Sequence, residues 1–285
     1  MEKIGDILAA RGDFQENFYQ LSVEILANPE IAAFVSAHQL TDDQLSRSFA
    51  KFQEYLTESA KKSGYQPTLV MNEGFVDVSY RETVALKTQR EESEQLRRVA
   101  LVGLPKALRA VSWDEVKADN ASQAQAYQKV VNFVAQFPEA KGLYLYGRFG
   151  IGKSFMMAAM ANSLAKHGVE TTLLHYPTFL AETNYDNVAE RVARVKKVQV
   201  LVLDDIGAEV NSAWTRDSIL QVVLQYRMDN RLPTFFTSNF SMTELQQHFS
   251  ETRNVADSWP AERLMERIRF LSEEVFMEGE NRRQL

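Results

Sequence analysis

The spacing of apolar positions changes in character along the first 100 residues. In residues 14–57 apolar side chains recur every three or four positions, which predicts helices, with a break at Asn28-Pro29. Thr41 and Gln44 have the spacing of a capping box, so a helix is expected to begin there. Around residues 68–80 the pattern predicts a β-hairpin with a short turn at Gly74. The apolar positions of the predicted helical faces are Phe14, Phe18, Leu21, Ile25, Leu45, Phe49, Phe52 and Leu56.

Further along, short apolar runs alternate with helical patterns. A charged helical stretch over 82–98 comes first and ends at Gly103 and Pro105. From about Asn120, alternation of strand and helix implies parallel strands joined by right-handed crossovers. We therefore predict an α/β fold with a parallel sheet between helices, preceded by a smaller, mainly helical domain with a β-hairpin. The predicted strands are 142–146, 169–175, 199–204, 233–238 and 270–276, and the predicted helices are 120–137, 153–167, 177–182, 186–197, 213–230, 241–249 and 260–268.

Composition adds limits to this outline. A chain of 285 residues is long enough for two modest domains, and the polar segment 111–120 is the expected linker between residues 1–110 and 121–285. The overall net charge of −6 does not indicate a nucleic-acid partner, so any contact with nucleic acid would need a local basic patch. The chain has no cysteine, which excludes disulfides, thiolate nucleophiles and cysteine-ligated zinc. The start of the chain does not resemble a signal peptide and no apolar run could span a bilayer, so we expect a soluble cytoplasmic protein without membrane contact.

A glycine-rich loop lies between the apolar run 142–146 and a helix-favouring run at 155–166. Its glycines let successive backbone N–H groups point into one hollow, where the N-terminus of the next helix adds partial positive charge. Lys153 would then reach the β- and γ-phosphates of ATP, and the Ser154 hydroxyl would ligate Mg²⁺. An ordinary strand-to-helix turn is the alternative, which the flanking pattern disfavours. The predicted cofactor-binding residues are Gly147, Arg148, Phe149, Gly150, Ile151, Gly152, Lys153 and Ser154.

Polar residues follow two other buried-type strands. Asp204 and Asp205 end the apolar run 200–203, at the edge where α/β sheets bind ligands. We assign Mg²⁺ to Asp204 and the orientation or deprotonation of the attacking water to Asp205, although such a pair also begins ordinary loops. Asn239 would lie beside them if the two strands are neighbours, and its amide could then bond the γ-phosphate or the water. Alternatively, Asn239 caps the helix that starts near Ser241.

Two basic groups have both a structural and a functional interpretation. Arg263, Arg267 and Arg269 have the spacing of a solvated helix face with Glu–Arg pairs, but one of them could serve a neighbouring subunit's γ-phosphate. A second basic cluster, over 191–197, lies near aromatic residues. Positive charge beside aromatic rings is typical of sites for single-stranded DNA. The same pattern also fits a solvated helix face beside aromatic residues of the core. The basic residues of this cluster are Arg191, Arg194, Lys196 and Lys197, and the nearby aromatic residues are Tyr176, Phe179 and Tyr185.

The chain has four histidines, His38, His167, His175 and His248, and we interpret all four as structural.

Five segments carry a family resemblance: 142–147, 203–209, 232–240, 263–268 and 279–283. The chain resembles the AAA+ ATPases and, within them, the bacterial DnaI-type replicative helicase loaders, which are similar to DnaC loaders. The resemblance implies a sensor-1 role for Asn239 and an arginine-finger role for Arg267, and leaves Arg282 and Arg283 as a possible second arginine sensor. It also implies that the N-terminal domain binds the replicative helicase, while the ATPase domain binds ATP and single-stranded DNA. Some relatives carry zinc in the N-terminal domain, but this cysteine-free chain is expected to carry none.

The leading functional hypothesis is an ATP-dependent loader that binds the hexameric replicative DNA helicase and helps place it on single-stranded DNA. ATP binding and hydrolysis would control assembly and release, and hydrolysis by an isolated chain would be slow because the arginine finger comes from an associated copy. An IstB-like transposition helper ATPase that acts directly on DNA is the main alternative, and a small-molecule kinase is a third. The short segment after the last predicted strand leaves no room for a C-terminal helix-turn-helix, which disfavours an initiator.

Overall fold

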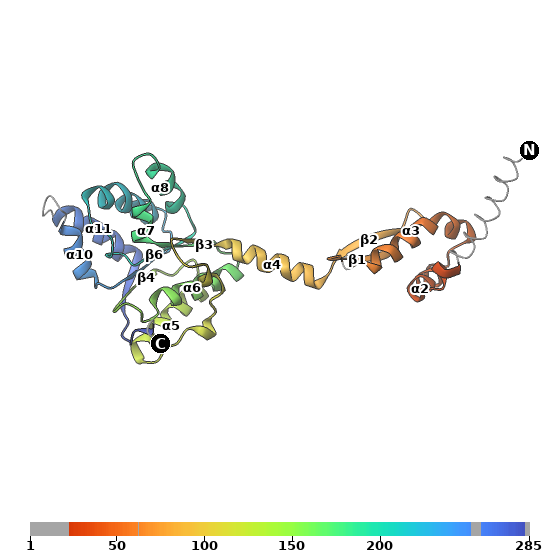
Figure 1. Ribbon diagram of the computed structural model, residues 1–285, viewed down its shortest axis with the longest axis horizontal. Helices are drawn as coiled ribbons and strands as arrows, with labels where there is room; N and C mark the ends of the chain where they lie inside the picture. The colour runs from red at the N-terminus through yellow and green to blue at the C-terminus, as the bar shows by residue number, and fades with distance from the viewer. Residues whose placement is uncertain (1–22, 62, 252–257, 283–285) are drawn as a thin grey trace, which may run out of the picture. The chain divides into compact units, whose positions relative to one another are not determined.

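The predicted helices and strands form two separate units in the computed structural model, which describes residues 23–61, 63–251 and 258–282 (Figure 1). One unit comprises Met1–Glu92 and the other Ser93–Leu285. Helix α4, Val84–Arg98, crosses from the first unit into the second. Among the described residues, no helix is both long enough and apolar enough to cross a membrane.

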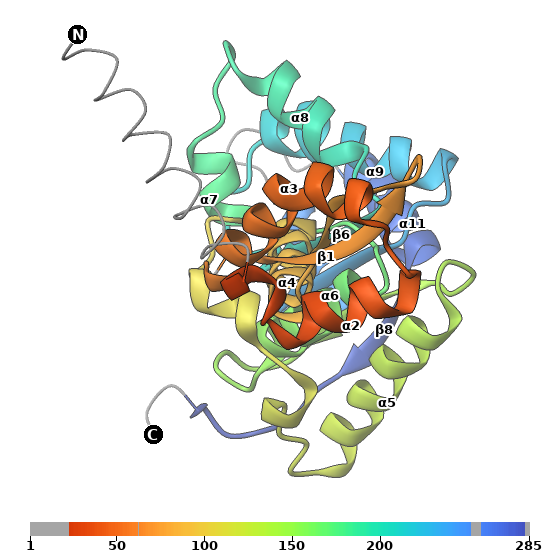
Figure 2. The same cartoon turned by 90° about the vertical axis from the view of Figure 1, so that its right-hand side faces the viewer.

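The first unit packs helices on a two-stranded sheet. Helix α2 (Pro29–His38) begins at an Asn28 cap, and α3 (Asp42–Ala60) begins at the predicted capping box of Thr41 and Gln44. Strands β1 (Tyr65–Asn72) and β2 (Phe75–Glu82) form the predicted antiparallel hairpin, against which α3 lies in Figure 2. Its buried core consists of Ile25, Ile31, Phe52, Tyr55, Leu69 and Val76. The predicted core positions Phe14, Phe18 and Leu21 lie outside the described residues.

The second unit is built around a six-stranded parallel sheet, in the order β3-β5-β6-β7-β4-β8. This confirms the predicted α/β fold with a parallel sheet between helices. The strands are β3 (Val99–Val102), β4 (Gly142–Tyr146), β5 (Thr171–His175), β6 (Val200–Asp204), β7 (Thr234–Ser238) and β8 (Ser272–Phe276). The helices include α5 (Ala121–Gln136), α6 (Lys153–Lys166), α7 (Tyr176–Ala181), α8 (Val188–Lys196), α9 (Gln221–Asp229), α10 (Met242–Ser250) and α11 (Ser258–Leu271).

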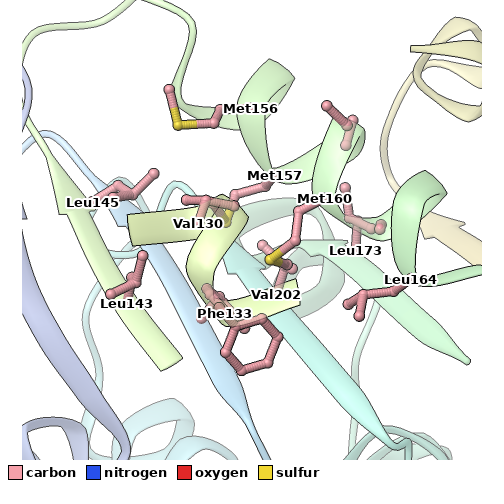
Figure 3. Packing of buried hydrophobic residues seen from close by; sticks show 14 of the residues in the cluster. Val130, Phe133, Leu143, Leu145, Met156, Met157, Met160, Leu164, Leu173 and Val202 are labelled. Carbon is pink, nitrogen blue, oxygen red and sulfur yellow. The ribbon is translucent and has the colours of Figure 1, made fainter. Parts of the chain in front are cut away.

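Alternate residues of each central strand face opposite layers of helices. Leu143 and Leu145 of β4 belong to the core shared with α5 and α6 (Figure 3), whereas Tyr144 belongs to the core on the other face. Figure 2 shows α5 on one side of the sheet and α8 and α9 on the other. Because the strands are covered on both faces, they read as continuous apolar runs in the sequence. The sheet thereby places every strand's carboxyl end at one edge, where the loops of the candidate site meet.

The region between the predicted domains differs from the sequence expectation. Strand β3 was not predicted, yet it pairs in parallel with β5 and extends the sheet. The predicted linker 111–120 follows a short 3-10 helix, Lys106–Ala110, and contains a second, Trp113–Glu115. Val111 is buried in the same core as α5 and α6, and Trp113 packs against it. The segment therefore belongs to the second unit, because its few apolar side chains fill the layer beside α6.

Candidate nucleotide site

The glycine-rich loop lies between β4 and α6, as its sequence context predicts. Gly147, Gly150 and Gly152 all have positive φ angles, of 147°, 78° and 103°, which other residues rarely adopt. The loop therefore curls over the N-terminus of α6, whose first residues are Lys153 and Ser154. A curled glycine loop at a helix N-terminus is suited to bind an anion.

Lys153 is buried beneath the loop, with 7% of its surface exposed. Its ammonium group donates to the carbonyl oxygens of Gly147 and Arg148, at 2.7 and 2.8 Å, and to Oδ1 of Asn239 at 3.0 Å. The loop and Asn239 thus hold the charge in place at the carboxyl edge of the sheet. The exposed side chains of Arg148 and Phe149 point outward from the loop, while Ile151 is buried in the core.

Strands β6, β7 and β4 are adjacent in that order, so Asp204, Asp205 and Asn239 meet the loop at one edge. The Asn239 Nδ2 donates to Oδ1 of Asp205 at 3.3 Å. Asn239 is not the cap of α10, since Ser241 forms a capping box with Glu244 at that helix start. The capping role is therefore excluded, and Asn239 lies at the carboxylate edge, where its contact with a γ-phosphate or a water stays a prediction.

Two residues that sequence reasoning did not assign to the site also lie there. The Thr237 hydroxyl donates to Oδ1 of Asp204 at 2.7 Å and accepts from the backbone N–H of Asp205 at 2.9 Å, so it fixes both aspartates. The His175 Nε2 lies 3.9 Å from Oδ2 of Asp205. His175 was interpreted as structural, but it ends strand β5, directly beside Asp204 in the register. The rule that strand ends meet at one edge could have found it.

A group of chain segments distant in sequence encloses the loop. The backbone N–H of Arg282 donates to the carbonyl of Gly150 at 3.0 Å. The Arg282 side chain donates to Oδ2 of Asp119 at 2.7 Å and to Oε1 of Gln123 at 2.9 Å. The final segment, 277–282, therefore ties the phosphate loop to the start of α5. Arg283, the other arginine noted there, lies outside the described residues.

Gly150 provides a test of this tail contact. A Cβ on Gly150 would overlap the side-chain oxygen of Asn281, whereas Gly168, with a similar φ of +83°, has nothing within 4 Å. Both alanine variants carry the backbone strain, of about 1 kcal/mol, but only Gly150→Ala displaces the tail. We expect Gly150→Ala to lower the free energy of unfolding by about 1 kcal/mol more than Gly168→Ala does. Urea unfolding measures both, and Asn281→Ala should recover the difference. Equal losses would contradict the packing of the tail on the loop.

Arg267 lies apart from these groups. It is in α11, is 9% exposed, and donates from Nε to Oε1 of Gln225 and from Nη1 to the carbonyl of Arg263. Arg263 is exposed, with its guanidinium over the Trp259 ring, and Arg269 donates to Gln246. The structure therefore assembles the phosphate loop, both aspartates and Asn239 in one place, and puts Arg267 in a separate hollow.

The basic cluster near α8 is mostly engaged within the chain. Arg191 pairs with Glu182, and Arg194 pairs with Glu190. Of the nearby aromatics, Tyr176 and Phe179 are buried at 2% and 3% exposure and are core residues. Tyr185 is 80% exposed, with its ring 5.0 Å from that of Trp214. Of the three aromatics predicted near this cluster, Tyr185 is therefore the exposed one.

The fold and loop define the chain as an α/β AAA+ protein: a parallel sheet between helices carries a phosphate loop after β4, with two aspartates and an asparagine at the same sheet edge. Residues 1–80 match the family described as "Primosomal protein DnaI N-terminus". The chain is 34% identical over 309 aligned residues to the replicative helicase loader DnaI of Bacillus subtilis (strain 168), covering 99% of both chains. It therefore belongs to the DnaI family of helicase loaders.

Solved structures agree with this placement. A crystal structure of DnaI is 37% identical, with a TM-score of 0.60, over 66% of this chain and 99% of that one. A protein described as a primosome component from Streptococcus pyogenes serotype M3 is 45% identical, with a TM-score of 0.58, over 67% of this chain and 98% of that one.

Proposed function

We propose that this protein is an ATP-dependent loader of the replicative DNA helicase. The family membership supports the loading role, since the Bacillus relative of matching length is a replicative helicase loader. The observation that carries the ATP dependence is the chain of contacts from Lys153 through Asn239 to Asp205, at 3.0 and 3.3 Å. It joins the group suited to bind phosphates to the group suited to activate water.

The residues present fit Mg²⁺ and ATP. The positive-φ glycines bend the loop around the N-terminus of α6, and Lys153 already holds its ammonium against carbonyl oxygens there. Mg²⁺ in such sites uses one or two side chains beside phosphate oxygens and water. Ser154 and Asp204 would hold the ion.

The roles of the side chains follow from their positions. Lys153 would bind the β- and γ-phosphates, and Asn239 would orient the γ-phosphate and Asp205 together. Asp205 would accept the proton of the attacking water, while Thr237 holds the carboxylate of Asp204 and the backbone N–H of Asp205 at the sheet edge. Bound Mg²⁺–ATP would supply the scissile phosphoanhydride and the neutralisation of its charge. Hydrolysis by an isolated chain would be slow, because the arginine finger comes from an associated copy. Such slow turnover suits a regulatory switch, in which the bound nucleotide controls assembly and release.

The N-terminal region, placed at residues 1–110 from the sequence, would bind the helicase hexamer, and residues 121–285 would bind ATP and single-stranded DNA. The family match at 1–80 supports the first assignment. The exposed Tyr185 with Trp214 supports the second, because bases stack on such rings. Copies of the chain would associate through their ATPase domains.

The loading role is tested by mixing the full-length protein with the replicative helicase of the same organism. Size-exclusion chromatography with ATP, ADP or no nucleotide should show co-elution that depends on the nucleotide. A fork-DNA assay then measures helicase placement on a single-stranded region. If the two proteins never co-elute but the chain still binds duplex DNA, the transposition-helper function is favoured instead.

Arg267→Ala is expected to remove the rise in ATP turnover per chain that association produces. An arginine supplied to a neighbouring γ-phosphate contributes about 10³-fold or more. The measurement is turnover per chain against protein concentration, from monomeric to associated. Arg269→Ala is the matched control, since it removes an exposed arginine side chain of the same helix, whose guanidinium donates to Gln246. If Arg267→Ala keeps the full rise, Arg267 is not the finger.

A further inference from the structure

Gln225 of α9 occupies a bridging position beside Arg267. Its Oε1 accepts from Nε of Arg267 at 2.8 Å, and its Nε2 donates to Oδ1 of Asp229 at 2.7 Å. The second bond fixes the orientation of the amide, because only the nitrogen end can donate to a carboxylate. The oxygen end is therefore presented to the arginine, and Arg267 is held by one side chain whose own direction is set by another.

This arrangement uses only part of the guanidinium group. The bonds to Gln225 and to the Arg263 carbonyl engage Nε and Nη1, and Nη2 takes part in neither. The same arginine lines a hollow of about 410 Å³ between α9 and α11, together with Gln221, Gln225, Arg263 and Lys196. The bridge thus fixes the plane of the guanidinium while the hollow stays open beside it.

The electrostatics of the hollow suit an incoming anion. Burial and the neighbouring charge of Arg263 lower the pKa of Arg267, so the surroundings disfavour its cation, while Asp229 and Glu266 act in the opposite sense. Asp217 and Lys196 also border the hollow. An oxyanion that entered beside Arg267 would relieve the repulsion between the two arginines.

We infer that Gln225 is a positioning residue for Arg267: it holds the guanidinium ready to contact the γ-phosphate bound by a second copy of this chain. The inference rests on the proposed function, in which Arg267 acts in trans. Without Gln225, Arg267 loses its Nε acceptor and gains rotational freedom. Because a displacement of about 1 Å can cost 10²-fold in rate, we expect Gln225→Ala to lower kcat of the associated protein about 10-fold.

The matched control is Gln247→Ala. Gln247 lies on α10 outside the hollow, is exposed, and donates to the carboxylate four residues on, Glu251, as Gln225 does to Asp229. Gln247→Ala should keep wild-type turnover. For Gln225→Ala, KM for ATP and the affinity for a fluorescent ATP analogue should be unchanged, since its own phosphate loop is intact. The double variant Gln225→Ala, Arg267→Ala should be no slower than Arg267→Ala.

Mixing experiments separate positioning from a structural defect. Lys153→Ala copies cannot use ATP well but carry an intact Arg267, so adding them to Gln225→Ala copies should restore turnover per functional site several-fold. Adding Lys153→Ala, Arg267→Ala copies should not. Wild-type kcat in Gln225→Ala overturns the inference, as does loss of turnover that Lys153→Ala copies cannot restore. If Arg267→Ala itself keeps full turnover, the trans-acting arginine of the proposed function fails instead.

Discussion

Lys153→Ala is expected to weaken ATP binding by about 100-fold. Removing one member of a buried, hydrogen-bonded charge pair costs about 3 kcal/mol, and that free energy is about a 100-fold change in Kd. Lys153 fits this case because only 7% of the residue's surface is exposed and its ammonium group already donates to three oxygen acceptors. A phosphate group would enter a site whose positive charge is in place before binding.

Equilibrium titration with a fluorescent ATP analogue measures the effect. Lys166→Ala is the matched control, since Lys166 is an exposed lysine in the last turn of the same helix, α6. It should leave Kd unchanged. Far-UV circular dichroism should show equal helix content in both variants. A Kd for Lys153→Ala within about threefold of wild type would contradict the assignment of the phosphate loop.

The sequence predicted the central strands well because their chemistry is local. Residues 142–146 and 200–203 are continuous apolar runs bounded by loop-forming residues, which is how strands covered on both faces read. Strand β3 was missed because its four residues, Val99–Val102, continue directly from a charged helix without a turn between them. Residues 99–102 form a strand because they pair with β5, and this pairing cannot be predicted from the local sequence.

The residues of the candidate site that follow strand ends could be predicted from the sequence, and the others could not. The rule that parallel strands end at one edge places Asp205 and Asn239 together, and the structure shows their hydrogen bond. Thr237 could not be singled out, because a threonine inside a strand is usually a packing residue. The tail contact of Arg282 with Asp119 joins residues 163 positions apart, and no local pattern reports it.

Arg227 has a different role, at the end of the sheet away from the phosphate loop. It is fully buried in α9, at 0% exposure, and its guanidinium donates only to neutral oxygens among its recorded partners in the described residues. Burial lowers its pKa to about 9, so the group is still charged at neutral pH. The acceptors are Oγ1 of Thr234 and the carbonyls of Lys196, Val198, Gln199 and Pro233. One side chain thereby joins the end of α8 to the starts of β6 and β7.

Arg227→Met is therefore expected to lower the free energy of unfolding by about 3 kcal/mol or more. Methionine fills much of the same volume, but it leaves several buried carbonyls without donors, and each unsatisfied group costs about 1–3 kcal/mol. The free energy of unfolding of Arg227→Lys should lie between the values for Arg227→Met and wild type, because an ammonium group has only three donors and lacks the planar fork of a guanidinium. The measurement is urea unfolding followed by tryptophan fluorescence, since Trp113, Trp214 and Trp259 all lie in the unit Ser93–Leu285.

Arg194→Met is the control for this experiment. Arg194 is in the neighbouring helix α8, its side chain is 77% exposed, and it pairs with Glu190 at i,i+4. Exposed pairs of that kind contribute about 0.3–0.5 kcal/mol, so loss of the Arg194–Glu190 pair should hardly change the urea concentration at which the protein unfolds. If Arg227→Met costs no more than Arg194→Met, the guanidinium does not hold this end of the sheet together. A large loss confined to Arg227 would show that the sheet's stability depends on a charge buried far from the nucleotide.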